Sequence, residues 1–405
     1  MSSTHTAPAR AAAAGVLFDG LLPQPPDAVL AVSKMFREDP RPAKIDVGVG
    51  VYRDANGHTP VFAAMKAAEA RLLETQETKA YLGPEGDFGY LERLSPIIFG
   101  RGAAADLFGV QTPGGTGALR LAAELAHAGR PGARVWLGAP SWPIHAPIFA
   151  EAGLEVISFR HFDPQTQALT FDETLAALKG AQAGDVVLLH GCCHNPSGAD
   201  PDLDQWRALT EVILERGLTP LIDLAYQGLG VGLDEDAAGL RLVLEAVDNA
   251  MVAYSCDKNF GLYRERTGAL FVRARAHAEV VRTNILKIAR CAWSMPPDHG
   301  AAAVRVILED EALTALWRGE LEGQRARLQA VREMLADADP RFEPIRSQRG
   351  MFSMLALSAA QVEALRRDHA VYMTGNGRIN IAGLRAETIG PFAAAYDAVL
   401  RDTKA

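Results

Sequence analysis

The chain has 405 residues, 48% of them hydrophobic, which is enough to bury a large core and suggests two or three structural units. Its 41 basic and 49 acidic residues give a net charge of −8, and no long basic run occurs. Nucleic acid and anionic membranes are therefore not expected partners, and no apolar stretch reaches the roughly 18–20 residues needed to span a bilayer.

The N-terminus and the cysteines predict a cytoplasmic protein. Residues 1–15 contain no apolar signal segment and are expected to form a disordered extension. The four cysteines include the adjacent pair Cys192 and Cys193, which cannot readily bond each other. This usage fits a reducing compartment rather than a disulfide scaffold.

Short apolar runs alternate with helical periods through the middle of the chain. A short helix and the strand-like segment KIDVGVGVY come first, at about residues 27–52. Apolar runs predict strands at 135–138, 154–159, 185–191, 219–226, 251–256 and 268–272. Amphipathic segments such as 203–217, which ends at Gly217, predict the helices between them. This alternation favours an α/β fold whose mostly parallel sheet is covered on both faces.

The pattern changes after about residue 300. A stretch without proline over roughly 301–337 predicts one long helix. The segments GMFSMLAL, AVYMT and GRINIAG predict short strands, and helices are expected around 359–368 and 386–401. These elements predict a smaller α+β domain, which the segment around 27–52 is expected to join.

Lys258 follows one of the predicted buried strands almost directly. Lysine is rarely buried without a reason, and the carboxyl end of a strand in an open α/β sheet is where ligands bind. From its position alone, however, a solvent-exposed lysine at a strand end is the simpler interpretation.

Asp223 lies inside the apolar segment LIDLAYQG. A buried carboxylate is unfavourable unless it is paired. A helix cap or a structural ion pair would satisfy it, and so would the protonated ring nitrogen of a bound pyridine. Tyr226, at the end of the same predicted strand, is placed to reach the same ligand.

Two turns are candidate ligand contacts. The segment TPGGTGALR (112–120) puts glycines ahead of a helical period, which lets backbone N–H groups approach a phosphate. Asn195 lies in the turn NPSG and is expected to point into the cleft.

Two other patterns suggest ligands that they do not fit. The segment HGCCHNPSG (190–198) has two cysteines and two histidines, but it lacks both C-x2-C spacing and a second ligand pair, so no metal is expected. The segment Gly48-Val49-Gly50 lacks the third glycine of a dinucleotide fingerprint, and no helix obviously follows it, so NAD is not expected.

Three arginines are candidate anion contacts, although each alone is more simply a surface residue. Arg266 lies eight residues after Lys258, near enough to share a phosphate site. Arg378 precedes an apolar strand and Arg290 precedes the segment CAWSMPP. A planar guanidinium is the group that holds a carboxylate with two hydrogen bonds.

Taken together, these segments resemble the class I aminotransferases that act on aspartate and aromatic amino acids. The resemblance runs from about residue 17 to the C-terminus. The matching strings, in one order and with ordinary spacing, are KIDVGVGVYRD, TKAYLGPEG, QTPGGTGALR, PSWPIH, GDVVLLHGCCHNPSG, LIDLAYQGL, DKNFGLYRERTGAL, PPDHGA, GMFS and GRINIAG.

The resemblance implies a fold-type I transferase: a mostly parallel seven-stranded sheet flanked by helices, with a smaller α+β domain. Residues 16–60 would form an N-terminal arm and part of the small domain. Residues 61–315 would form the large cofactor-binding domain, and residues 316–405 the small C-terminal domain. Cis peptide bonds are implied before Pro140 and Pro196.

The resemblance also implies pyridoxal 5′-phosphate as the cofactor. Lys258 would carry it and move a proton between the substrate Cα and C4′ of the cofactor. Asp223 would pair with the protonated pyridine nitrogen, supported by His145, while Tyr226 and Asn195 would bind the phenolic oxygen. The remaining implied contacts are Trp142 on the ring face, and Gly115, Thr116, Ser255, Arg266 and, across a subunit boundary, Tyr81 at the phosphate.

The implied reaction is a ping-pong transfer of the amino group of an aromatic amino acid or aspartate to 2-oxoglutarate. Arg378 would bind the substrate α-carboxylate, and Arg290 from the neighbouring subunit a distal carboxylate, with Gly50, Trp142 and Asn195 also lining the substrate site. A site shared in this way implies an obligate homodimer.

Several residues differ from those usual in the family. Asp257 replaces a serine, Trp293 a tyrosine, and Met295 and Ala80 each an asparagine. The loss of two polar groups makes the side-chain pocket roomier or more apolar, which favours aromatic substrates. The alternatives are a strict aspartate aminotransferase, a β-decarboxylase or lyase on the same fold, and a cofactor-binding regulator. The regulator would need a DNA-binding extension that 15 N-terminal residues cannot supply.

Overall fold

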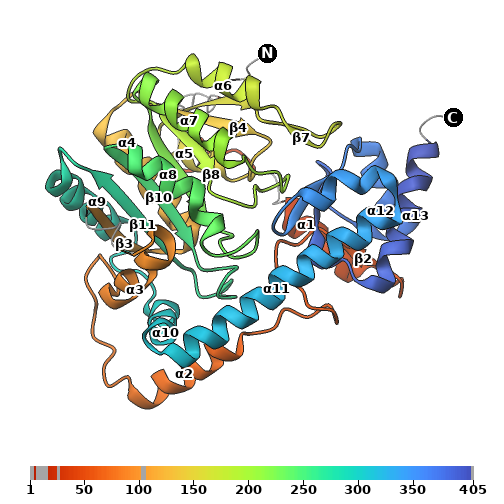
Figure 1. Cartoon of the computed structure of the whole chain (residues 1–405), viewed down its shortest axis with the longest axis horizontal. Helices are drawn as coiled ribbons and strands as arrows, with labels where there is room; N and C mark the ends of the chain where they lie inside the picture. Colours follow the sequence, from red (N-terminus) through yellow and green to blue (C-terminus); the bar gives the residue numbers. More distant parts are fainter. Residues whose placement is uncertain (1–3, 6–16, 25–27, 102–105, 403–405) are drawn as a thin grey trace.

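The computed structural model of the chain describes residues 4–5, 17–24, 28–101 and 106–402. A large sheet forms its centre, in the order β1-β5-β4-β8-β9-β10-β11-β3 (Figure 1). Seven of its strands are β3 (Leu107–Pro113), β4 (Arg134–Ala139), β5 (Glu155–Arg160), β8 (Val186–His190), β9 (Thr219–Leu224), β10 (Asn249–Ser255) and β11 (Thr267–Ala274). Among these seven, β11 is antiparallel to both neighbours and the other pairings are parallel. The predicted mostly parallel seven-stranded sheet is therefore confirmed.

Two strands of this sheet were not predicted. β3 has no continuous apolar run, because Gly109, Gln111 and Pro113 interrupt it. The two-residue strand β1 (Thr4–His5) pairs antiparallel with β5. The other residues of the extension expected at 1–15 lie outside the described part of the chain.

Alternate residues of each strand face two separate cores. In β9, Leu221 faces one core and Ile222 the other, as the two-residue period of a strand requires. Helices α4 (Gly114–Gly129), α5 (His145–Glu151) and α9 (Ala278–Ala292) contribute to the Leu221 side. The Ile222 side is covered by α3 (Phe88–Phe99), α6 (Phe171–Lys179), α7 (Leu203–Arg216) and α8 (Ala238–Ala246). Burial on both faces explains why the strands are nearly continuous apolar runs.

The prediction of a single helix at 301–337 is wrong in one respect: the segment forms two helices, separated at Asp310. Helix α10 (Asp298–Glu309) ends there and α11 (Glu311–Ala338) begins. The Asp310 carboxylate accepts the backbone N–H groups of Ala312 and Leu313, which caps the start of α11. In Figure 1, α11 runs from α10 and α2 (Ala63–Thr75) to the elements of the C-terminal part. Among the described helices, none is long and apolar enough to cross a membrane.

A smaller group of elements lies beyond the far end of α11. β12 (Phe352–Met354) pairs antiparallel with β14 (Arg378–Asn380), and β13 (Val371–Tyr372) pairs parallel with β2 (Ile45–Asp46). Helices α1 (Ala28–Glu38), α12 (Ala359–His369) and α13 (Ala386–Asp402) surround these strands (Figure 1). The strands and helices predicted after residue 340 are confirmed, and the segment after α1 joins them as expected.

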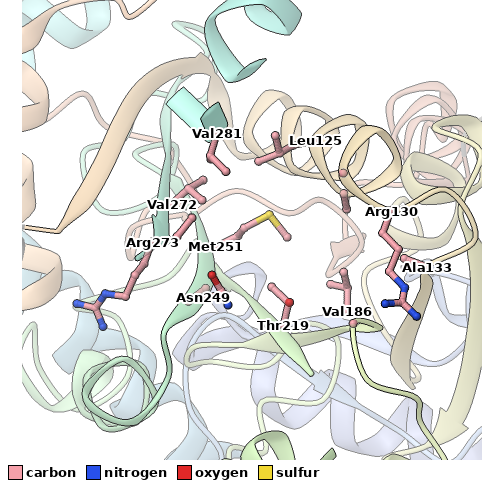
Figure 2. Close-up of a pocket in the computed structure, with 15 residues that line it drawn as sticks. Leu125, Arg130, Ala133, Val186, Thr219, Asn249, Met251, Val272, Arg273 and Val281 are labelled. Atoms are coloured by element: carbon pink, nitrogen blue, oxygen red, sulfur yellow. The ribbon is translucent and has the colours of Figure 1, made fainter. Parts of the chain in front are cut away.

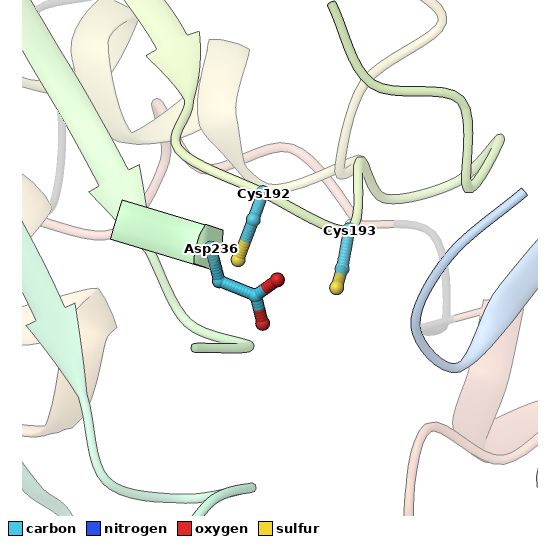
Figure 3. A group of neighbouring side chains, drawn as sticks. All are labelled: Cys192, Cys193 and Asp236. Carbon is cyan, nitrogen blue, oxygen red and sulfur yellow. The ribbon is translucent and has the colours of Figure 1, made fainter. Parts of the chain in front are cut away.

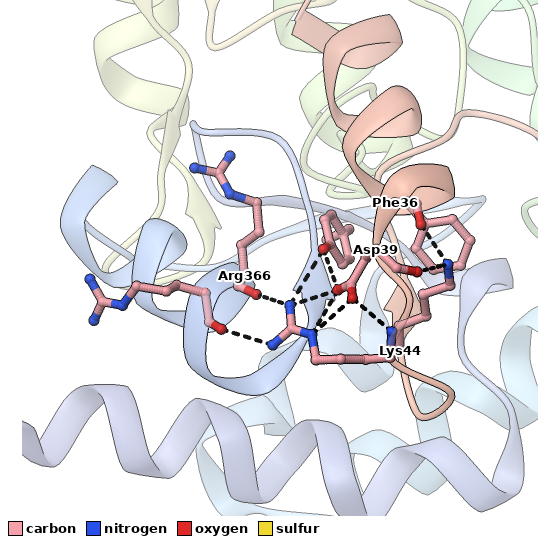
Figure 4. Close-up of polar contacts among 7 residues, drawn as sticks. Phe36, Asp39, Lys44 and Arg366 are labelled. Atoms are coloured by element: carbon pink, nitrogen blue, oxygen red, sulfur yellow. Dashed lines mark hydrogen bonds and ion pairs between the residues drawn. The ribbon is translucent and has the colours of Figure 1, made fainter.

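A polar network fastens the N-terminal segment to this group (Figure 4). Asp39 follows α1, and its carboxylate accepts from Arg41 Nε at 2.8 Å and from Tyr372 Oη at 2.5 Å. Arg41 also donates to the carbonyl oxygens of Arg366 and Arg367 in the last turn of α12, each at 2.8 Å. The hydrogen bonds from Arg41 and Tyr372 hold the pKa of Asp39 well below its usual range. The segment that follows α1 is thereby bound to residues more than 300 positions away in the sequence.

Candidate active site

Two cavities lie at opposite edges of the large sheet. The smaller, of about 200 Å³, opens where β8, β9 and β10 begin and is lined mainly by apolar side chains such as Met251 and Val272 (Figure 2). The larger, of about 920 Å³, lies where the same strands end, beside His190, Asp223 and Ser255. Ligands of open α/β sheets bind at the carboxyl ends of the strands, so the larger cavity is the candidate site.

Most of the site residues expected from the sequence line this one cavity. They are Gly50, Gly115, Thr116, Trp142, Asn195, Asp223, Tyr226, Ser255, Lys258, Arg266 and Arg378. Four residues that were not predicted for the site also line it: Phe352, Tyr263, His190 and Asp257. Phe352 and Tyr263 lie in the segments GMFS and DKNFGLYRERTGAL, and the resemblance of these segments to the family is what could have pointed to them.

Lys258 lies in the turn that follows β10, with its side chain 17% exposed. Its ammonium lies 5.2 Å from the centre of the Tyr226 ring and 3.9 Å from Oδ2 of Asp257. The turn is fixed because Phe260 N–H donates to the carbonyl of Cys256. The simpler interpretation, a lysine in open solvent, is therefore wrong: the amine lines the cavity.

Asp223 is buried in β9 and is held from behind by His145. His145 Nε2 lies 3.0 Å from Asp223 Oδ2, and Nδ1 of the same ring lies 2.8 Å from Ser141 Oγ, which is in turn 3.1 Å from His190 Nε2. Burial by itself would raise the pKa of Asp223, but the hydrogen bond and the charge of His145 lower it overall, with smaller contributions from His190 and Lys258. Burial lowers the pKa of His190 to about 3. The arrangement keeps a carboxylate ionised inside the protein.

Tyr226 and Asn195 meet on one side of the cavity. Asn195 Nδ2 donates to Tyr226 Oη at 3.3 Å, and burial raises the pKa of Tyr226. The peptide bonds before Pro140 and Pro196 are both cis, as predicted. The Trp142 ring also lines the cavity and meets the His145 ring edge to face, with centroids 5.2 Å apart.

The start of α4 and Arg266 form one end of the cavity. Gly114 has φ +68, and a Cβ built on it would lie 2.6 Å from Nη2 of Arg266. A Cβ on Gly115 would lie 3.1 Å from Cβ of Ser255. Arg266 itself has φ +54, an unfavourable conformation for a residue with a side chain. A helix N-terminus with a guanidinium beside it is suited to an anion.

Arg378, the first residue of β14, approaches the cavity from the smaller group of elements. Its Nη2 donates to the Gly48 carbonyl at 2.8 Å, and its guanidinium carbon lies 4.6 Å from the centre of the Phe352 ring. Phe352 also lies against Gly50, where a Cβ would come within 3.4 Å of its ring. Of the two glycines of the dinucleotide-like pattern, Gly50 thus lines the cavity and Gly48 accepts a hydrogen bond from Arg378 beside it.

Tyr81 and Arg290 do not line the cavity of their own chain. Tyr81 is 92% exposed, and Arg290 is exposed in the last turn of α9, where it bonds to Ser294 Oγ. Both were assigned to the site of a neighbouring subunit, and that assignment stays a prediction.

Cys192 and Cys193 lie beside Asp236, with one potential ligand atom of each residue within 4.8 Å of the others (Figure 3). Asp236 could not be predicted as their neighbour, because it is distant along the chain. Its two oxygens accept the backbone N–H groups of Gly228, Gly230 and Val231. A hydrogen bond between the thiols and burial raise the pKa of Cys192. The Asp236 carboxylate is therefore already occupied by backbone hydrogen bonds, and its observed role is to hold the loop at residues 228–231.

Comparisons with known proteins agree with the geometry. The model of the family "Aminotransferase class I and II" matches residues 42–395. A tyrosine aminotransferase of Rhizobium meliloti is 52% identical over 388 residues, 93% of this chain and 99% of that protein. An aspartate aminotransferase of Salmonella typhi is 43% identical and covers 95% of this chain and 100% of its own length. The crystal structure of an aromatic-amino-acid aminotransferase of Burkholderia pseudomallei, covalently bound to pyridoxal phosphate, superposes with a TM-score of 0.92, 36% identity and coverage of 95% and 100%.

Proposed function

Because the chain belongs to the class I and II aminotransferases, we propose that it carries pyridoxal 5′-phosphate on Lys258 and moves the amino group of an aromatic amino acid or aspartate to 2-oxoglutarate. The observation that carries this proposal is that Lys258 and Asp223 line one cavity, with His145 bonded to Asp223 from behind. Donor and acceptor would use the same cavity in turn, in a ping-pong order.

The residues at the cavity fit the cofactor. The start of α4 with Gly115 and Thr116, together with Arg266, suits the phosphate, and Gly115 packs so closely on Ser255 that a side chain there would push Ser255 away by a few tenths of an ångström. Asp223 is the buried acceptor that a protonated pyridine nitrogen needs. When bound, pyridoxal phosphate withdraws the electron pair that remains on the substrate Cα after its proton leaves.

The chain's own groups would bind, orient and move the proton. Arg378 holds the substrate α-carboxylate, since its guanidinium lies at the cavity and over the Phe352 ring. The amine of Lys258 takes the Cα proton and later returns one. Asp223, whose pKa is lowered, stays ionised and so keeps the ring nitrogen protonated. Tyr226 and Asn195 hydrogen-bond the phenolic oxygen from the side of the cavity where they meet.

Two features favour aromatic substrates while leaving room for aspartate. Ala80 and Met295 stand where the family usually has asparagine, so the side-chain pocket loses polar groups. Arg290 remains available for a distal carboxylate. The names of the relatives include both a tyrosine and an aspartate aminotransferase. A strict aspartate aminotransferase is therefore the second candidate.

Homodimerisation is part of the proposal. Tyr81 and Arg290 lie outside their own cavity and are exposed, as expected of residues that complete the site of a second copy. Equilibrium sedimentation tests this, and a monomer with full dicarboxylate activity would contradict it.

We further propose the division into a large domain at 61–315 and a small domain formed by 16–60 and 316–405. The β2–β13 pairing and the Asp39–Arg41 network support it. We propose a cytoplasmic location, since the cysteines are free thiols.

An absorbance titration of the purified protein tests the function. We expect a cofactor band that bleaches with phenylalanine and with aspartate and returns with 2-oxoglutarate. Bleaching with aspartate alone would establish the strict aspartate enzyme. Release of carbon dioxide or ammonia without a 2-oxo acid would establish a decarboxylase or lyase, and the absence of any cofactor band would refute the proposal.

A further inference from the structure

Asp257 is an acidic residue at the anion-binding end of the cavity, where the family usually has serine. Its Oδ2 accepts from Arg266 Nη1 at 2.8 Å and lies 3.9 Å from the Lys258 ammonium. Its Oδ1 is buried and has no hydrogen-bond partner among the described residues. The side chain is 10% exposed and lines the cavity with Ser255. The guanidinium nearest the start of α4, that of Arg266, is therefore already hydrogen-bonded to the carboxylate of Asp257.

This placement creates a charge conflict for a bound phosphate. Arg266 contributes one positive charge and Asp257 one negative charge, so the two together are neutral. A phosphate monoester, with a second ionisation near pH 6, adds close to two negative charges above neutral pH. Two anions on one guanidinium, one of them with an unpaired buried oxygen, repel each other unless a proton binds between them.

We propose that Asp257 makes binding of the cofactor phosphate depend on a proton: the pair formed by Asp257 and the phosphate takes up one proton from solvent and keeps it. This inference rests on the proposed function, because it concerns the phosphate of that cofactor. A chain with serine at position 257 binds the dianion without this proton. The affinity of the natural chain therefore falls about tenfold per pH unit relative to that of Asp257→Ser in the alkaline range.

The other groups that face Asp257 do not supply this proton dependence. They are Lys258, Arg266, Tyr263, Tyr90 and Cys256. Burial raises the pKa of Tyr263 to about 12 and raises the pKa values of Tyr90 and Cys256, so all three stay neutral between pH 7 and 9. Arg266 stays charged in every variant. Lys258 lies 3.9 Å from Asp257, so its own proton is separated from that of the Asp257–phosphate pair by repeating the comparison with Lys258→Met in every chain.

Calorimetric titration with pyridoxamine 5′-phosphate tests the proposal on the full chain freed of cofactor. This probe has the phosphate but no aldehyde, so it cannot bond to Lys258. Titrations at pH 8 in buffers of different ionisation enthalpy give the number of protons taken up. We expect the natural chain to take up one proton more than Asp257→Ser or the isosteric Asp257→Asn. Between pH 7 and 9 its affinity should fall about 100-fold relative to theirs.

Glu265→Gln is the matched control, because it removes a carboxylate next to Arg266 that does not line the cavity. It should behave like the natural chain. Equal proton uptake by the natural chain and both Asp257 variants, with all three binding the probe, would overturn the inference and leave the proposed function intact. If no variant binds the probe and no cofactor band forms, the proposed function itself fails. Should Asp257→Ser not fold, Asp257→Asn alone decides the comparison.

Discussion

Replacing His145 by leucine tests whether His145 keeps Asp223 ionised. The substitution removes the 3.0 Å hydrogen bond to Asp223 Oδ2 and roughly preserves the volume of a fully buried side chain. A hydrogen bond to a charged group contributes about 1.5–3 kcal/mol. At about 1.36 kcal/mol per pH unit, its loss raises the pKa of Asp223 by about 1–2 units. The acid limb of the pH profile of kcat/KM should move to higher pH by the same amount.

The same shift appears in stability. A lowered pKa stabilises the fold above the ordinary pKa of the carboxyl group, and this stabilisation is lost as pH falls through the lowered value. His145→Leu should therefore lose stability above about pH 4 and show a weaker further loss on acidification than the natural chain. Ser141→Ala is the control, since it removes the Ser141 contacts to His145 Nδ1 and His190 Nε2 but leaves both partners of the His145–Asp223 contact in place. An unshifted acid limb in a His145→Leu protein that folds and binds the cofactor would show that His145 does not act on Asp223.

Three further predictions follow from particular contacts. Arg332→Met should lower the free energy of unfolding, measured by urea denaturation, by about 3–5 kcal/mol, because Ser353 Oγ and the carbonyls of Gly350 and Phe352 lose the buried guanidinium that donates to them. Arg318→Met, at an exposed position of the same helix, is the control and should change this free energy little; equal urea midpoints of the two variants would contradict the argument. Gly114→Ala should weaken pyridoxamine 5′-phosphate binding by about tenfold, because the added Cβ displaces Arg266 and the φ angle of residue 114 is positive. Gly129→Ala, in open space at the end of the same helix, is the control and should not weaken binding; equal affinities of the two variants would refute the role given to Gly114. Arg290→Ala should cost activity with aspartate far more than activity with phenylalanine, and Arg378→Ala should cost both, so equal losses with the two substrates on replacing Arg290 would refute its assignment to the distal carboxylate.

The sequence predicted the large sheet well because its strands are buried on both faces. Such strands need nearly continuous apolar runs, and β8, β9 and β10 have them. β3 has the same burial at its centre but contains Gly109 and Gln111, so hydrophobicity alone does not reveal it. The break at Asp310 was missed because aspartate is tolerated inside helices, and only the bonds to Ala312 and Leu313 show that it caps one.

The site residues were predictable one by one only as weak candidates. Lys258, Asp223 and Asn195 each had an ordinary structural explanation. The ligand-binding explanation was preferred only because the segments that contain them occur in the same order as the matching segments of the family. The topology then explains why they meet. Parallel strands put their carboxyl ends on one edge of the sheet, so residues near the ends of β8, β9 and β10 converge although they are far apart in the chain.

The residues that surround a buried charge could not be predicted from the sequence. Arg332 lies in a helical segment rich in charged residues and reads as solvent-exposed, yet its guanidinium is buried against the loop that precedes β12. The sequence showed Asp257 only as a residue that differs from the family's usual serine. Its hydrogen bond to Arg266 in the folded chain is what makes the difference relevant to anion binding. In both cases the free energy depends on which acceptors or cations surround a charge after folding, and the sequence order of the residues does not contain this information.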